Sequence, residues 1–108
     1  MAATLTDVHV LLVGRTPAVI DDLLEQIDAP AVTFHTGSSF EDVAAHLERT
    51  LMDHVILGGG LDLETRLRIV RSVFDRSTST TVHMNSPSGP DSYLPFVRAV
   101  LRGFDAAR

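Results

Sequence analysis

Four short apolar segments, each followed by a segment of helical period, constrain the fold of this chain more than any other feature. We expect strands at residues 8–13, 31–35, 53–57 and 80–84. The first of them, "VHVLLV", is apolar almost throughout, as in a strand that is buried on both faces. Alternating strands and helices are typical of a parallel sheet with right-handed crossovers. We therefore predict a single α/β domain over residues 1–108, with the pattern βαβαβαβα, strand order 2-1-3-4 and helices on both faces of the sheet.

Each predicted helix has a start signal and an apolar stripe. Thr16 can cap a helix that begins at Pro17, Ser38 with Glu41 has the spacing of a capping box, and Asp62 can cap the third helix. Residues three and four apart lie on one face of a helix, which defines the side expected to face the sheet. The expected inward residues are Val19, Ile20, Leu23, Leu24 and Ile27; Phe40, Val43, Ala44 and Leu47; Leu63, Leu67, Val70 and Phe74; and Tyr93, Leu94, Val97, Val100, Leu101 and Phe104.

Composition excludes several classes of function. The 108 residues carry a formal net charge of −5, which argues against DNA binding. All basic residues are arginine, so no lysine can act as a Schiff base, a phosphate ligand or a general base. The absence of cysteine removes disulfides, thiol catalysis and thiolate metal sites. No apolar run reaches the roughly 20 residues of a membrane span, and the first residues do not form a secretory signal, so we expect a cytoplasmic protein without membrane contact.

Two stretches carry a family resemblance. "VHVLLVGRTPAVIDDLLEQI" and "MDHVILGGGLDLETRLRIVRSVF" resemble the receiver domain of response regulators, which has a flavodoxin-like fold. Asp53 matches the start of the family's third-strand pattern. The resemblance covers roughly residues 7–86 and the last helix, and it implies the same βα scaffold.

The residues that carry receiver chemistry are absent from the matching positions. Gly14 and Arg15 stand where the family has an acidic pair, and Gly58 stands where it has the phospho-accepting aspartate. Asn85 or Ser86 roughly matches the family's Ser or Thr, whereas the family's lysine and fifth strand have no counterpart. Receiver phosphorylation needs carboxylates that hold magnesium and one that attacks phosphorus. The resemblance therefore implies a shortened pseudo-receiver that is not phosphorylated at the family's position.

The three glycines after the third strand are the candidate ligand-binding element. Gly58, Gly59 and Gly60 could present backbone N–H groups at a helix N-terminus, with Arg15, Thr16 and Ser86 on the same rim. Thr36 and Ser38 would end near that rim too. Such a site would suit a phosphate, a carboxylate or a nucleotide. The spacing matches neither G-x-G-x-x-G nor a P-loop. A tight strand-to-helix turn beside a surface arginine is the structural alternative.

The remaining polar residues predict no metal and no catalytic site. Four histidines fall one to each strand, at positions that we expect not to converge, and His46 lies on the second helix. The serines lack a G-x-S-x-G elbow and a convincing base, although His35 precedes two of them closely. Arginines on the third and fourth helices are expected on solvated faces or at an interface with an acidic partner. The residues are His9, His35, His54 and His83; Ser38, Ser39, Ser86 and Ser88; and Arg66, Arg68, Arg71, Arg76, Arg98 and Arg102.

Together these features predict a non-enzymatic regulatory or protein-interaction module without a cofactor. The fourth strand is an edge that carries no charge and no proline, so we expect a homodimer through this strand and its flanking helices. The alternative is a small-anion or nucleotide-binding protein that uses the Gly58–Gly60 loop and Arg15, either by itself or as one subunit of an enzyme.

Overall fold

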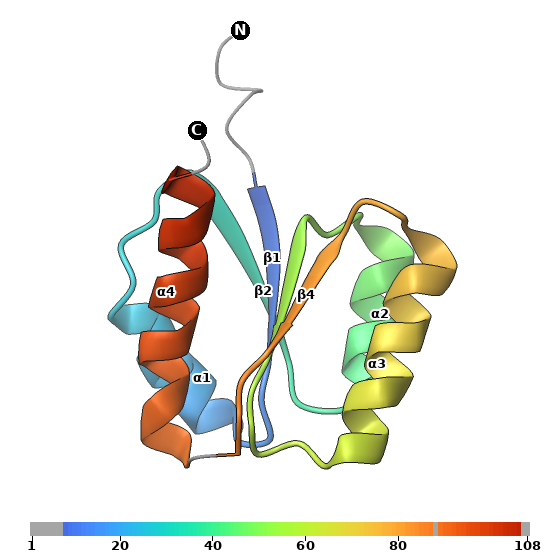
Figure 1. The fold of residues 1–108 in the computed structure, drawn as a ribbon, viewed down its shortest axis with the longest axis horizontal. Coiled ribbons are helices and arrows are strands. Elements are labelled where there is room, and N and C mark those ends of the chain that lie inside the picture. Colours follow the sequence, from blue (N-terminus) through green and yellow to red (C-terminus); the bar gives the residue numbers. More distant parts are fainter. Residues whose placement is uncertain (1–7, 88, 107–108) are drawn as a thin grey trace, which may run out of the picture.

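The computed structural model describes residues 8–87 and 89–106, except for the side chains of Pro90 and of residues 104–106. Strands and helices alternate along the chain, as predicted from the sequence (Figure 1). The second strand ends two residues later than expected, and the other strand bounds agree within one residue. In order, the elements are β1 (Val8–Val13), α1 (Pro17–Glu25), β2 (Val32–Gly37), α2 (Phe40–Arg49), β3 (His54–Leu57), α3 (Leu63–Arg76), β4 (Thr81–Met84), the 3₁₀ turn η2 (Pro90–Ser92) and α4 (Tyr93–Ala106).

The four strands form one parallel sheet in the order β2-β1-β3-β4, which confirms the predicted topology. Val13 of β1 is aligned with Gly37 of β2 and with Leu57 of β3, so the carboxyl ends of the three strands lie at one edge. The order reverses between β1 and β3, where open α/β sheets bind their ligands. The architecture is flavodoxin-like.

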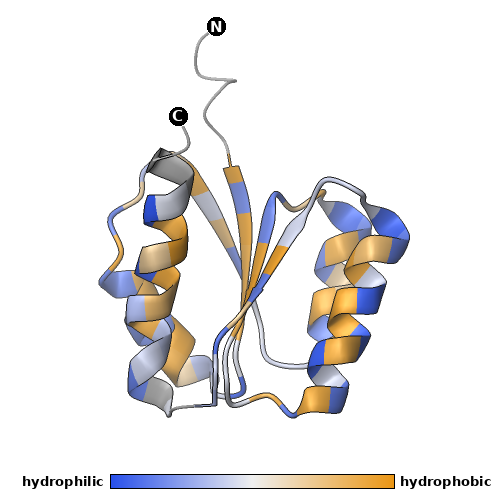
Figure 2. Cartoon of the chain, viewed as in Figure 1, coloured by the Kyte–Doolittle hydropathy of each residue, from blue (hydrophilic) through white to orange (hydrophobic). Residues whose placement is uncertain are grey.

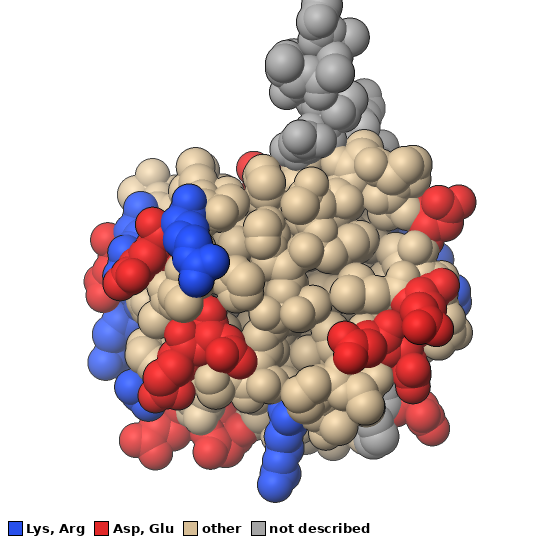
Figure 3. All heavy atoms as spheres, turned by 180° about the vertical axis from the view of Figure 1, so that it is seen from behind, with Lys and Arg blue, Asp and Glu red and all other residues tan. Residues whose placement is uncertain are grey.

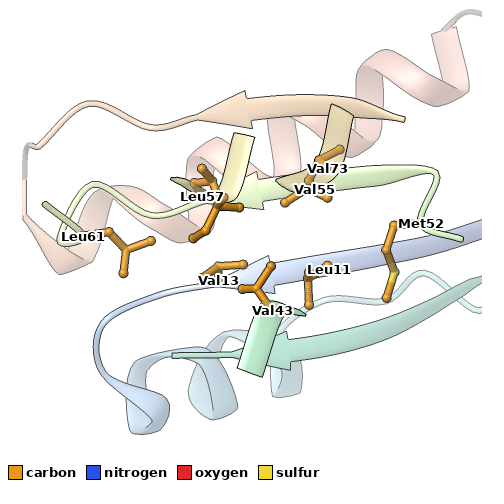
Figure 4. Close-up of a cluster of buried hydrophobic side chains, with 9 residues drawn as sticks. Leu11, Val13, Val43, Met52, Val55, Leu57, Leu61 and Val73 are labelled. Carbon is orange, nitrogen blue, oxygen red and sulfur yellow. The ribbon is translucent and has the colours of Figure 1, made fainter. Parts of the chain in front are cut away.

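Helices cover both faces of the sheet, α1 and α4 on one side and α2 and α3 on the other (Figure 1). Successive residues of a strand point to opposite faces, which divides the core in two. Val10 and Leu12 pack with α1 and α4. Leu11 and Val13 pack with α2 and α3, and Figure 4 shows part of this second cluster. Strands buried on both faces explain why "VHVLLV" is apolar almost throughout.

The helix starts follow the predicted signals, with one shift of register. Thr16 stands at the N-cap of α1 before Pro17, but its side chain makes no capping hydrogen bond. The predicted capping box at Ser38 is wrong by one residue, since Ser39 Oγ accepts from the Asp42 N–H at 3.1 Å. Asp62 caps α3 as predicted, where its Oδ1 accepts from the Thr65 N–H at 2.7 Å.

The predicted inward face of α3 is wrong. Ile69 and Val73 are the buried residues of this helix. Leu63, Leu67 and Phe74 are 59%, 50% and 50% exposed. The helix carries two apolar stripes, and periodicity alone did not say which of them faces the sheet. Elsewhere the expected faces hold: Ile20 and Leu23 of α1, Val43 of α2, and Tyr93 and Val97 of α4 are buried. The side chain of Phe104 lies outside the described residues.

Both edge strands are uncharged, but their surroundings differ. In Figure 2, where β4 lies in front, α3 presents hydrophobic residues beside it. Four of the five large hydrophobic side chains that are exposed among the described residues belong to α3 or β4, and the fifth is Leu51. Seen from the β2 side, charged side chains gather on both flanks of an uncharged zone (Figure 3). The β4 side is therefore the apolar side of this molecule.

Candidate functional site

The loops that follow β1 and β3 meet at the rim of the sheet, at the switch point. They enclose an open cavity of about 370 Å³ between the N-terminus of α1 and the loop that follows β4. Five of the six predicted site residues line it. The lining residues are Gly14, Arg15, Thr16, Val19, Ile20, Gly58, Gly59, Gly60, Pro87, Gly89 and Tyr93.

Close backbone approach explains two of the three glycines. A Cβ on Gly59 would lie 2.1 Å from the Ser86 carbonyl oxygen, and one on Gly58 would lie 3.3 Å from the Val13 carbonyl oxygen. A Cβ on Gly60 would meet only the Cβ of Arg15, at 3.5 Å. None of the three has a positive φ. Gly59 therefore lets the β3–α3 loop approach the β4–α4 loop, and Gly58 lets it approach the end of β1, as in the structural alternative stated for this motif.

Ser86 contributes to the rim through its backbone. Its carbonyl oxygen faces Gly59, and Ser86 is not among the residues that line the cavity. Thr36 and Ser38 are also engaged locally: the Thr36 carbonyl accepts from His46 Nε2 at 2.8 Å, and Ser38 N–H donates to Asp42 Oδ2 at 3.0 Å. The predicted polar rim is thus largely used for structure. Ser88 lies outside the described residues.

Among the described residues, Arg15 is the one charged residue that lines the cavity, and an acidic neighbour weakens its field. Arg15 is exposed, and its charge is close enough to Asp62 to help lower the pKa of that carboxyl. The larger cause of that lowered pKa is the Thr65 hydrogen bond at the start of α3. The positive field that Arg15 offers an anion is therefore partly offset by a fixed negative charge.

The floor of the cavity is largely apolar. Val19, Ile20 and Pro87 contribute side chains, and the buried Tyr93 ring stands between the two loops. The Tyr93 hydroxyl is 2.6 Å from the Ile56 carbonyl oxygen and 3.2 Å from that of Val13, to which it donates. Burial raises the pKa of this hydroxyl far above its usual range, so it stays protonated. Because it bonds to the backbone of β1 and β3, this hydroxyl fixes the floor.

The positions that would carry receiver-type phosphorylation have no carboxylate. Gly14 and Gly58 have no side chain, and Arg15 would repel a metal ion. Asp53 lies at the opposite end of β3, where its Oδ2 accepts from the His9 N–H at 2.8 Å. Asn85 of the fourth-strand end donates to Ser92 Oγ at 2.8 Å. These positions serve to hold the fold together.

The four strand histidines do not converge at one place, but they form two pairs that the sequence did not predict. His9 Nδ1 lies 3.0 Å from His35 Nε2, and the His35 and His46 ring centres are 5.5 Å apart. The parallel pairing of β1 with β2 brings His9 and His35 together, although they are 26 residues apart in the sequence. Helix α2 places His46 beside His35. Partial burial and the two neighbouring imidazoles lower the pKa of His35.

A second pair of histidines flanks Thr81 on the exposed side of β4. His54 Nδ1 is hydrogen-bonded to Thr81 Oγ1, which lies 3.0 Å from His83 Nε2. Partial burial lowers the pKa of both imidazoles. Sequence reasoning missed this group, although the register of β3 against β4 would have found it. Thr81 is exposed on the edge strand.

The arginines are distributed over separate structural contacts. Arg68 lies 4.0 Å over the Phe40 ring, Arg76 pairs with Glu48 at 3.7 Å, and Arg98 donates to the Gln26 carbonyl at 3.1 Å. Arg98 and Arg102 line a shallow depression at the other end of the molecule from Arg15. The arginines therefore do not form one strip for a nucleic acid.

Within the described part of the chain, no group of three or more His, Asp or Glu side chains is arranged to hold a metal ion. No helix there has the length and apolar character needed to cross a membrane. Comparisons with models of protein families, with curated proteins and with solved structures found no match to this chain.

Proposed function

We propose that this protein is a non-enzymatic regulatory or protein-interaction module, built on a receiver-like scaffold without a phosphoacceptor. It would bind a second copy of itself through β4 and the flanking helices. A chain without cysteine is consistent with a cytoplasmic protein. The observation that carries the proposal is that β4 is an edge strand and that α3 and β4 expose large apolar side chains near this edge.

The outer edge of β4 has backbone groups that can form hydrogen bonds with another strand. Thr81 and Asn85 donate their N–H groups to the carbonyls of Asp53 and Leu57. By alternation, the N–H and C=O groups of Val82 and Met84 point away from the sheet. Such unpaired groups template the addition of another strand unless charge, proline or a bulge protects them. The sequence "TVHM" offers none of these protections.

Among the described residues, the cavity at the switch point presents mainly backbone and apolar surface. The cavity there is lined by glycine backbone, apolar side chains and Arg15, and its tyrosine is bonded to the backbone. We infer that the fold serves to present a surface that binds another protein chain.

Analytical ultracentrifugation at micromolar concentration tests this function. The expected mass is twice the 11.7 kDa of one chain. Met84→Pro removes an outward N–H without breaking the β3 ladder, and it should weaken the dimer about tenfold or more. Met84→Leu keeps the N–H and is the control. A monomer at every concentration would refute the proposed homodimer.

The second candidate is a binding protein for a small anion or nucleotide. The cavity at the switch point favours it, since Arg15, Thr16 and the Gly58–Gly60 loop line one space. Thermal denaturation with phosphate, nucleotides and flavin tests this candidate. A ligand-induced rise that Arg15→Ala abolishes and Arg102→Ala retains would support it, and no shift with any of these compounds would refute it.

A further inference from the structure

Helix α3 carries an apolar stripe that the described chain leaves largely exposed. The stripe consists of Leu63, Leu67, Val70 and Phe74, whose spacing of four, three and four residues is that of a helix-packing seam. Three of these side chains are at least half exposed, while Val70 also packs against the core. An exposed apolar seam of this regularity indicates a contact surface.

The stripe lies on the β4 side of α3. At 100° per residue, it is displaced by about a third of a turn from the buried Ile69–Val73 side. Arg68, which stacks on Phe40 of α2, is displaced by a similar angle in the opposite direction. The stripe therefore faces away from α2 and toward the open edge of the sheet. Met84 adds to it, because its partner Leu57 belongs to the core under α2 and α3, and Met84 is 45% exposed.

We propose that the stripe packs antiparallel against the same stripe of a second copy. Leu63 then lies against the partner's Phe74, and Leu67 lies against the partner's Val70. This inference rests on the proposed homodimer and specifies its helix contact, direction and register. A two-fold axis perpendicular to the sheet beside β4 makes both contacts at once, because it sets β4 and α3 each antiparallel to its copy.

Charge complementarity selects the antiparallel direction. Glu64 and Arg71 flank the stripe on the same side of α3, Glu64 in the first turn and Arg71 in the second half of the helix, and both are exposed. An antiparallel pair brings each Glu64 toward the partner's Arg71, so opposite charges meet twice across the axis. A symmetric parallel pair would place the two Glu64 side chains on opposite sides of the seam, and the two Arg71 side chains likewise, so neither pairing of opposite charges would form.

Placing a charge in the stripe tests the contact. Leu67→Arg should weaken the dimer at least about tenfold in sedimentation equilibrium, since an unpaired charge would be buried at the interface. Leu51→Arg is the matched control, because Leu51 is a leucine of similar exposure, 63%, outside the stripe. Circular dichroism checks that both variants are folded. Equal dimerisation of the two variants would overturn the proposal.

Cysteine cross-linking tests the direction, since the chain has no cysteine of its own. Two single variants, Leu63→Cys and Phe74→Cys, are prepared separately, mixed and oxidised. The antiparallel register predicts a disulfide between the two different variants and little within either one. Preferential cross-linking of each variant to itself would indicate a parallel pair and overturn the proposed direction.

Charge reversal supplies a further readout. Glu64→Arg alone and Arg71→Glu alone should each weaken the dimer roughly 2- to 5-fold, and the double variant should recover it. Additive weakening in the double variant would contradict the pairing of these residues.

The outcomes separate this inference from the proposed function. A chain that is monomeric at every concentration removes the homodimer itself. A dimer that Met84→Pro splits and Leu67→Arg leaves intact retains the β4 contact and refutes the α3 contact.

Discussion

Gly59 shows how the absence of one side chain shapes the rim of the sheet. The Cα of Gly59 faces the backbone of Ser86 and Pro87. A Cβ on this residue would lie only 2.1 Å from the Ser86 carbonyl oxygen. Backbone cannot move aside as a flexible side chain can, so the two loops would have to separate. The neighbouring Gly60 has no such constraint, since only ordinary contact with Arg15 would result.

We therefore expect Gly59→Ala to lower the free energy of unfolding by at least about 2 kcal/mol, through forced separation of packed backbone. Gly60→Ala should change it by less than about 0.5 kcal/mol. Urea denaturation of both variants beside the parent protein measures the difference. Equal stabilities would mean that the approach of the two loops is not required.

At the scale of the element, α3 has two apolar faces with different roles. Ile69 and Val73 are buried against the sheet, whereas Leu63, Leu67 and Phe74 remain exposed. One stripe of α3 thus stabilises the fold by packing against the sheet, and the other is exposed and available for contact with another molecule.

Ile69→Ala should cost about 2–4 kcal/mol of folding free energy, because it removes buried methyl and methylene groups and leaves a cavity. Phe74→Ala should cost less than about 1 kcal/mol in a dilute monomer, although its side chain is larger. Denaturation at nanomolar concentration, followed by fluorescence of Tyr93, excludes any contribution from self-association. The reverse ranking would restore the inward face expected from periodicity.

Where β1, β2 and α2 meet, His35 couples folding to pH. His35 has a lowered pKa because of partial burial and the nearby imidazoles of His9 and His46. A histidine whose pKa is lower in the folded state binds fewer protons when folded. Its contribution to stability is therefore complete above the unfolded pKa of about 6.5 and is lost as pH falls toward the folded value.

We expect the free energy of unfolding to decrease as pH is lowered from about 7.5 to about 5, in the window where histidine titrates. His35→Gln should flatten that slope, since one group that resists protonation is removed. Denaturant titrations at several pH values measure it. The lowered pKa values of Asp42 and Asp62 act only at more acidic pH and do not mask the effect. An unchanged slope in the variant would rule out His35 as a contributor.

For the whole molecule, the flavodoxin-like architecture is separate from receiver chemistry. The sheet order and the position of the switch point are those of a flavodoxin-like fold. The rim carries Gly14, Arg15 and Gly58, and Asp62 is engaged in capping α3.

Incubation with acetyl phosphate and magnesium should therefore leave the intact mass of the protein unchanged. The reason is that no carboxylate group stands free at the end of β3 to attack phosphorus, and Arg15 opposes binding of the metal. Intact-mass spectrometry at neutral pH detects an added phosphoryl group directly. A phosphorylated species at Asp53 or Asp62 would contradict this account.

The sequence by itself determined the alternation of strands and helices, the parallel sheet and its order. These follow from local periodicity and from the handedness of βα units, which are properties of short segments. It also placed Arg15 and the Gly58–Gly60 loop at one rim, because the carboxyl ends of neighbouring parallel strands meet there.

Only the tertiary structure decided which stripe of α3 is buried and which histidines meet. Leu67 and Ile69 are equally apolar, and what separates them is the position of α2 and of the sheet edge around the helix. His9 and His35 are brought into contact by strand register, which depends on pairing between distant segments. Contacts of this kind are set by the packing of whole elements, and no local pattern encodes them.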